Sequence, residues 1–184
     1  MTRQKTVSDS VVIDVDPQTA YAAVSDITQM GRWSPENLGG TVGARATGDP
    51  GSRGPATGPV TVGTSFVGRN RRGKAQWVTE CTVTAADPGE RFAFRVHRIG
   101  VATPRVNGTI ATWDYRFEAV DAGTRVTETW TDDRPWPDIA ATVFDKVATG
   151  GSTFAQFQRK NIARTLQRLK SELEGARSTD TDRG

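Results

Sequence analysis

Apolar residues recur at helical spacing near the end of the chain, over residues 152–174. At ~100° per residue, the side chains that fall within an arc of roughly 60° are Ile162, Leu166, Leu169 and Leu173. Ser152 stands where a helix cap is expected, and no Pro or Gly follows it before Gly175. The pattern therefore predicts a helix roughly 35 Å long, whose apolar face needs a sheet to cover it.

Strand-like alternation fills most of the chain before this helix. Residues 7–15 predict a strand, after which Asp16 and Pro17 supply an N-cap and a first-turn proline for a short helix. A second short helix is predicted over residues 27–33, and a weak strand over residues 38–47. Further strands, separated by turn residues, are predicted over residues 64–70, 74–84, 91–99, 109–119 and 124–131.

The last two of these strands have patterns that predict their pairing. Aromatic residues alternate with charged ones in the first strand, and Val126, Glu128 and Trp130 alternate with threonines in the second. Matching the apolar faces pairs Phe117 with Val126, Tyr115 with Glu128, Trp113 with Trp130 and, on the outer face, Glu118 with Arg125. A glycine bulge at Gly123 would shift this register by one residue.

Two segments interrupt the regular pattern. Residues 48–63 hold five glycines and three prolines, which predicts a loop insertion; a disordered insertion is favoured over a binding lid. Residues 132–151 are interpreted as a loop followed by a short helix over residues 138–147. We expect one domain over residues 1–175 and a disordered tail over residues 176–184.

Composition limits the classes of function. The 184 residues are 35% apolar, and 24 basic against 21 acidic side chains give a net charge of +3, so binding to nucleic acid is not expected. With Cys81 and His97 as the only cysteine and histidine, we expect no disulfide, no metal site and no cofactor. No apolar run is long enough to span a membrane and residues 1–10 lack a signal-peptide core, so a cytoplasmic location is expected.

Three stretches resemble the START-like (SRPBCC) superfamily, particularly its polyketide cyclase/dehydrase-like members. They are Val11-x-Ile-x-Val-Asp-Pro-x-x-Ala-Tyr to Trp33-Ser-Pro, Gly123-Thr-x-Val-x-Glu-x-Trp130, and Thr165-Leu-x-Arg-Leu-Lys170. The resemblance implies an α+β helix-grip fold, in which a curved antiparallel sheet wraps around the long C-terminal helix and two short helices follow the first strand. It also implies an apolar cavity between sheet and helix. Members bind lipids, hormones or polyketides and some are enzymes, but they share no catalytic motif.

Glu128 is the candidate catalytic residue. In the predicted register it points inward between Val126 and Trp130, opposite Tyr115. Burial disfavours an ionised carboxyl, which would suit a general acid or a hydrogen bond to a ligand. The alternative, that Glu128 pairs with Arg98 or Arg95, is favoured because buried acids are usually paired.

Aromatic side chains supply most of the candidate ligand site. The candidate ligand-binding residues are Trp33, Phe66, Trp77, Phe92, Phe94, Trp113, Tyr115, Glu128, Trp130 and Phe154. Roughly half of the aromatic set is expected to be ordinary core. Phe154 and Phe157 depart from the apolar stripe of their helix, and Phe154 is expected at the cavity entrance. His97 is interpreted as an outer-face residue and Cys81 as a small buried one.

Three kinds of function remain open. The leading hypothesis is a protein that binds a small hydrophobic molecule, such as a lipid or polyketide. The second is an enzyme of the cyclase or aromatase kind that uses Glu128 for proton transfer. The third is a macromolecular adaptor that uses a basic surface: the turn at residues 69–74, otherwise interpreted as solvated, and the ridge of Lys160, Arg164 and Arg168. The sequence leaves the ligand, catalysis and the oligomeric state open.

Overall fold

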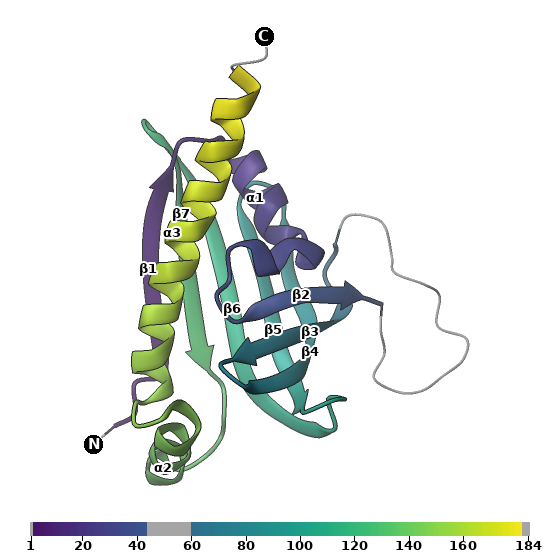
Figure 1. Ribbon diagram of the computed structural model, residues 1–184, viewed down its shortest axis with the longest axis vertical. Coiled ribbons are helices and arrows are strands. Elements are labelled where there is room, and N and C mark those ends of the chain that lie inside the picture. The colour runs from purple at the N-terminus through teal and green to yellow at the C-terminus, as the bar shows by residue number, and fades with distance from the viewer. Residues whose placement is uncertain (1, 44–59, 182–184) are drawn as a thin grey trace.

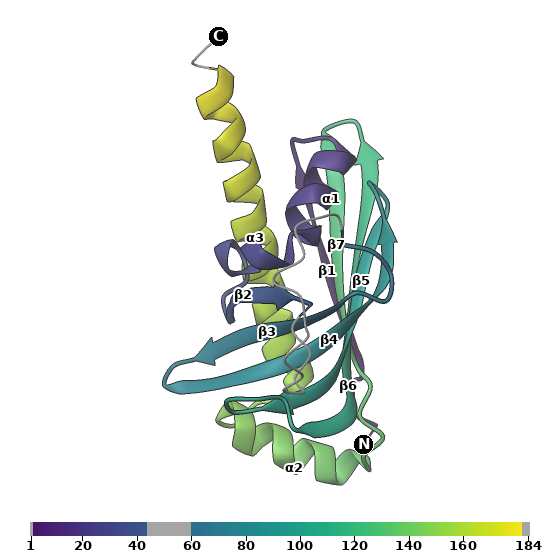
Figure 2. The ribbon, with the colours of Figure 1, turned by 90° about the vertical axis from the view of Figure 1, so that its right-hand side faces the viewer.

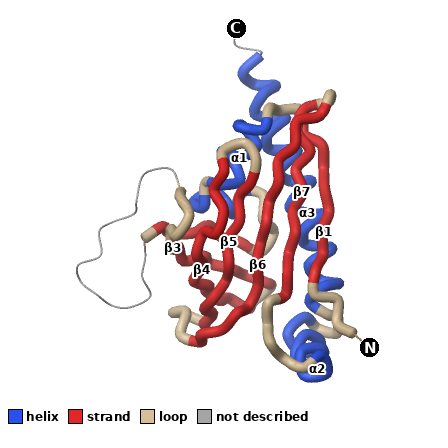
Figure 3. The backbone as a smooth tube through the Cα atoms, turned by 180° about the vertical axis from the view of Figure 1, so that it is seen from behind, coloured by secondary structure: helices blue, strands red, loops and turns tan. Residues whose placement is uncertain are grey.

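One antiparallel sheet curves around a long C-terminal helix (Figure 1). The computed structural model describes residues 2–43 and 60–181. The strands are β1 (Thr6–Ile13), β2 (Asn37–Val42), β3 (Ser65–Arg72), β4 (Ala75–Asp87), β5 (Arg91–Gly100), β6 (Val106–Val120) and β7 (Gly123–Asp132), in the spatial order β1-β7-β6-β5-β4-β3-β2. Seen from behind, the sheet forms one layer with the long C-terminal helix on its far side (Figure 3). The predicted α+β helix-grip fold is confirmed.

The predicted register of the last two strands is confirmed. Phe117 lies opposite Val126, Tyr115 opposite Glu128, and Trp113 opposite Trp130. Gly123 pairs directly with Val120, so no bulge shifts the strands. Its φ of +117° and the backbone oxygen of Ile13, only 2.2 Å from where a Cβ would stand, explain why this position needs glycine.

Two short helices close one end of the concave face. They are α1 (Pro17–Ser25), capped by Asp16 as predicted, and the 3-10 helix η1 (Ile27–Arg32). Tyr21 of α1 meets the rings of Phe92 and Phe117 edge-on, at centroid distances of 6.4 and 5.8 Å. The predicted strand over residues 38–47 corresponds to β2. Its last residues and most of the 48–63 insertion lie outside the described residues.

The long helix α3 (Phe154–Thr181) lies along β1 and β7 on the inner face (Figures 1 and 2). Ile162, Leu166 and Leu169 are buried, as predicted, whereas Leu173 is only half-buried. Over the described ranges, residues 2–43 and 60–181, no helix is long and apolar enough to cross a lipid bilayer.

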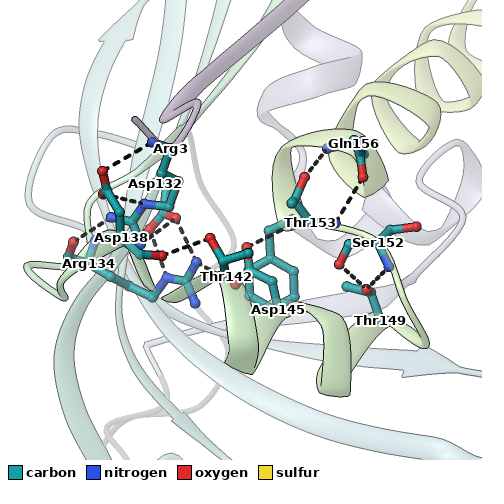
Figure 4. A network of polar contacts seen from close by, with 11 residues as sticks. Arg3, Asp132, Arg134, Asp138, Thr142, Asp145, Thr149, Ser152, Thr153 and Gln156 are labelled. Atoms are coloured by element: carbon teal, nitrogen blue, oxygen red, sulfur yellow. Dashed lines mark hydrogen bonds and ion pairs between the residues drawn. The ribbon is translucent and has the colours of Figure 1, made fainter. Parts of the chain in front are cut away.

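Both predicted ends of α3 differ from the structure. Ser152 is not the cap: Thr153 Oγ1 accepts from Gln156 N at 3.2 Å, and Gln156 Oε1 accepts from Thr153 N at 3.1 Å, which is a capping box (Figure 4). The helix also continues through Gly175 into residues 176–181, which were predicted to be a disordered tail. A glycine inside a helix costs only about 1 kcal/mol relative to alanine, so it weakens the helix without ending it.

A buried ionic network joins the start of the chain, the end of β7, and helices α2 (Asp138–Thr149) and α3 (Figure 4). Arg134 Nη2 donates to Asp132 Oδ2 at 2.6 Å and to Asp145 Oδ1 at 2.8 Å. Arg3 Nη1 approaches Asp132 Oδ2 at 3.4 Å. Asp145 Oδ2 accepts the backbone N–H of Phe154 at 2.9 Å. These contacts fix α2 beside the start of α3, because each buried charge has an opposite charge in contact.

Candidate functional site

Glu128 and Tyr115 form a buried polar pair on the inner face of the sheet. Glu128 projects from β7 and Tyr115 from the facing position of β6, with 2% and 4% of their surfaces exposed. The Tyr115 hydroxyl donates a hydrogen bond to Glu128 Oε1 at 2.8 Å. The expected inward direction of Glu128 is confirmed. The favoured pairing with Arg98 or Arg95 is wrong, since Arg98 bonds Glu80 at 3.1 Å instead.

Burial sets the protonation state of this pair. Desolvation raises the pKa of the Glu128 carboxyl from 4.5 to about 8, against the opposing effect of the Tyr115 hydrogen bond. Desolvation and the neighbouring Glu128 likewise raise the pKa of Tyr115 well above its ordinary value. At neutral pH Glu128 is therefore mainly a neutral carboxylic acid that can donate a hydrogen bond.

One oxygen of this carboxyl has no partner among the residues that the structure describes. Glu128 Oε2 is buried and makes no hydrogen bond with any group of residues 2–43 and 60–181. Since the large majority of buried side-chain polar atoms are hydrogen-bonded, such an atom calls for an explanation, and a ligand or water group is one. Glu128 thus has one oxygen hydrogen-bonded to Tyr115 and one buried oxygen without a partner in the described part of the chain.

Aromatic and aliphatic side chains surround the pair on the inner face. Across neighbouring strands, Phe92 lies opposite Tyr115, and Phe94 lies opposite Trp113, which in turn lies opposite Trp130. Phe92 and Trp130 are buried, whereas Trp113 is half-buried. The structure therefore places five of the aromatic candidates in two neighbouring cross-strand rows, Phe92–Tyr115–Glu128 and Phe94–Trp113–Trp130.

The other aromatic candidates lie outside these two cross-strand rows, although Phe66 contacts one of their rings. Trp33 and Phe66 are buried in the core, and Phe66 packs edge-on against Phe94 at 5.3 Å between ring centroids. Trp77 lies 5.5 Å from the guanidinium of Arg72. Phe154 stands at the start of α3, with its ring 4.7 Å from the Arg134 guanidinium and 6.2 Å from the Phe144 ring. An entrance role for Phe154 stays a prediction.

Arg72 makes contacts that the sequence analysis did not predict. The turn at residues 69–74 was interpreted as solvated, but Arg72 folds back and its guanidinium lies 3.8 Å from the centre of the Phe157 ring. Arg72 Nη1 also donates to the Ala148 carbonyl at 3.3 Å, and Glu36 provides its counter-ion. The misfit of Phe157 with the apolar stripe was the available signal: its ring packs against this cation rather than the sheet.

Cys81 and His97 take no part in the Glu128 pair. Cys81 is buried as predicted, and desolvation raises the pKa of its thiol to about 12, so it is unreactive. His97 Nε2 lies 3.7 Å from Glu80 Oε1. Within residues 2–43 and 60–181, no group of three or more His, Cys, Asp or Glu side chains could hold a metal ion.

A separate polar pocket of about 400 Å³ lies on the surface between η1 and α3. Its lining consists of Arg32, Gln167, Arg168, Ser171 and Glu172. Arg32 and Glu172 form an ion pair there. Because the pocket contains none of the inner-face aromatic residues, it is distinct from the Glu128 site.

The fold and the inner-face site define a helix-grip protein of the START-like class. The chain belongs to the family of polyketide cyclases/dehydrases and lipid transport proteins, whose sequence profile matches residues 4–174. Family and fold fit a domain that binds hydrophobic ligands. A search of curated proteins gave no match.

Solved structures from several bacteria share the fold. A START superfamily protein from Mycobacterium smegmatis matches with a TM-score of 0.63 and 13% identity, over 94% of this chain and 99% of its own. Protein NE0264 from Nitrosomonas europaea has a TM-score of 0.62 and 10% identity, over 97% and 99%. The Polyketide_cyc-like protein Cgl2372 from Corynebacterium glutamicum has a TM-score of 0.51 and 26% identity, over 95% and 94%.

Proposed function

We propose that this protein binds a small hydrophobic molecule, of the lipid or polyketide kind, between the inner face of the sheet and α3. The observation that supports this most directly is the buried Oε2 atom of Glu128, which has no hydrogen-bond partner among the described residues and lies on a sheet face rich in aromatic side chains. Sites for small ligands are typically apolar with a few polar groups that fix orientation. The Glu128–Tyr115 pair is such a group, and the rings on β5 to β7 supply the apolar lining.

The protonation state of Glu128 selects the polar group that the ligand carries. Because desolvation raises the pKa of Glu128 to about 8, the carboxyl is mostly neutral at pH 7 and its free oxygen offers an O–H donor. A neutral donor suits a carbonyl or hydroxyl oxygen, whereas a ligand ammonium would need the ionised carboxylate. We therefore expect an apolar ligand with one carbonyl or hydroxyl near Glu128.

Native mass spectrometry of freshly purified protein tests this proposal. A co-purified ligand adds a discrete mass to the protein, and gentle activation of the complex releases that mass. Val62→Ala, at a position that is 63% exposed, is the control and retains the same adduct. Protein found only at its own mass, which also fails to take up fatty acids or aromatic polyketides offered in excess, contradicts the proposal.

A second candidate function is catalysis of the cyclase or aromatase kind. The observation that favours it is the pKa of about 8, which places Glu128 near the range where a general acid or base works best at neutral pH. Glu128 would then donate a proton to, or remove one from, carbon next to an enolisable carbonyl. Glu128→Gln should abolish turnover while the substrate still binds; equal turnover by the variant rules out this role.

A further inference from the structure

Helix α2 exposes an apolar face to solvent. Five of the nine large hydrophobic side chains that are exposed in the described residues lie in this helix or just before it: Trp136, Ile139, Val143, Phe144 and Val147. Ile139, Val143 and Val147 are 82%, 60% and 81% exposed. Residues four apart lie on the same side of a helix, so these three form one continuous stripe.

The opposite side of α2 holds the helix in this orientation. Ala141 and Asp145 are buried there, and Asp145 bonds both Arg134 and the first backbone N–H of α3. Turning the apolar stripe inward would take Asp145 away from both partners and leave the buried Arg134 with one carboxylate fewer. Breaking a buried ion pair is strongly destabilising, so the exposure of the stripe is built into the fold.

The position of α2 leaves the stripe accessible. The helix lies across one end of the molecule, at the end opposite the C-terminus, and its axis runs roughly perpendicular to the long axis of the protein (Figures 1 and 2). A flat surface approaching this end would meet α2 along its length. At 1.5 Å per residue its 12 residues span about 18 Å.

The charges around the stripe are mainly positive. Lys146 is exposed within α2 itself, whereas Asp145 is buried and Asp138 is engaged by Arg3. The contact from Arg72 to the Ala148 carbonyl brings the turn between β3 and β4, with exposed Arg71 and Lys74, to the C-terminal end of α2. The exposed surface at this end of the helix therefore combines apolar and cationic side chains.

We propose that the apolar stripe of α2, together with Lys146, Arg71 and Lys74, docks the protein on the surface of an anionic lipid bilayer. Apolar helix faces edged by basic side chains bind the boundary between headgroups and acyl chains, and each lysine or arginine there adds attraction to anionic lipid. Trp136, at the start of the helix, is a residue type that favours this boundary. A second copy of the chain fits less well, because Asp145 is buried against Arg134 and Asp138 already contacts Arg3, so α2 offers a partner's Lys146 little negative charge.

Flotation with lipid vesicles tests this docking surface. The full-length protein is mixed with vesicles of phosphatidylcholine alone, or with part of it replaced by phosphatidylglycerol, and bound protein is quantified. Wild type should bind the phosphatidylglycerol vesicles and lose that binding as salt rises. Val143→Asp and Val147→Asp should each lower the partition coefficient about tenfold or more, since each loses the burial of a valine side chain.

Val62→Asp is the matched control. Val62 is 63% exposed and precedes β3 at the end of that strand away from Arg72, so its substitution should leave vesicle binding unchanged. Circular dichroism spectra should show that all three variants are folded. An absence of vesicle binding, an equal loss in Val62→Asp, or a dimer in lipid-free solution that Val143→Asp dissociates would each overturn the proposal.

Discussion

The pH dependence of stability is the sharpest consequence of burying Glu128. The pKa of its carboxyl is about 8 in the folded protein and 4.5 when exposed, as in the unfolded chain. A carboxyl whose pKa is raised on folding makes its full contribution to stability at pH values below the pKa of the unfolded chain. This contribution is lost as pH rises towards the pKa of the folded protein. Between the two values the unfolded chain has released the proton and the folded protein still holds it. The free energy of unfolding should therefore fall by roughly 5 kcal/mol over the whole window.

Comparison with Glu128→Gln isolates this effect. Glutamine keeps the size of the side chain and an acceptor for the Tyr115 hydroxyl, but it does not titrate. Effects of other groups, such as Asp132, whose pKa is lowered by its bonds with Arg134 in spite of burial, largely cancel in the difference between the two proteins. From pH 5 to pH 8.5, the stability of wild type relative to Glu128→Gln should drop by about 4 kcal/mol.

Urea unfolding, followed by far-ultraviolet circular dichroism at pH 5, 7 and 8.5, measures this difference directly. The midpoints should diverge as pH rises, with wild type becoming the less stable of the two. Parallel pH profiles would show that Glu128 titrates near its ordinary pKa, which would refute the reasoning from burial and from its unpaired oxygen.

Three further predictions concern the fold. Leu166 of α3 is 1% exposed. Its replacement by alanine should lower the free energy of unfolding by roughly 2–5 kcal/mol in a urea experiment, and a loss below about 1 kcal/mol would mean that the Leu166 side chain is not enclosed. Removing the exposed Glu118–Arg125 pair, whose closest atoms are 3.3 Å apart, should cost less than about 1 kcal/mol in a double-mutant cycle, and a larger coupling would contradict its exposure. Asp145→Ala should cost about 3 kcal/mol or more, since Arg134 and the Phe154 N–H both lose a buried partner. An Asp145→Ala protein as stable as wild type in the same urea experiment would show that the ionic network does not hold α2.

Local patterns in the sequence were sufficient to predict the sheet and the register of its last two strands. The two-residue period of Trp113, Tyr115 and Phe117 and the glycine at the following turn allow one pairing with a consistent apolar face, and that pairing forms. The same pattern brought Glu128 to the inner face. Its partner was predicted wrongly because the rule that buried acids find arginines ignores a neutral carboxyl, for which the facing Tyr115 suffices.

Long-range contacts account for the parts that the sequence did not reveal. Arg134 contacts Asp145 and the Phe154 ring only after the loop that follows β7 has placed α2 beside α3. The apolar stripe of α2 suggests by its period a helix that faces the core, whereas the buried Asp145 forces the stripe outward. Arg72 looks like a solvated turn residue until folding brings it against Phe157. Each of these depends on residues far apart along the chain.

Binding of an apolar dye tests the central claim, that a hydrophobic molecule occupies the inner face beside Glu128. A naphthylamine dye should bind with a dissociation constant in the micromolar range, about −8 kcal/mol, and quench the fluorescence of the neighbouring tryptophans. Tyr115→Phe removes only a hydroxyl, and Trp130→Ala removes a ring of the lining. The control Arg71→Ala alters the turn between β3 and β4. The dye's affinity should fall about tenfold in Trp130→Ala, fall less in Tyr115→Phe, and stay unchanged in Arg71→Ala. An absence of dye binding, or an equal loss in all three folded variants, would contradict a ligand site on the inner face.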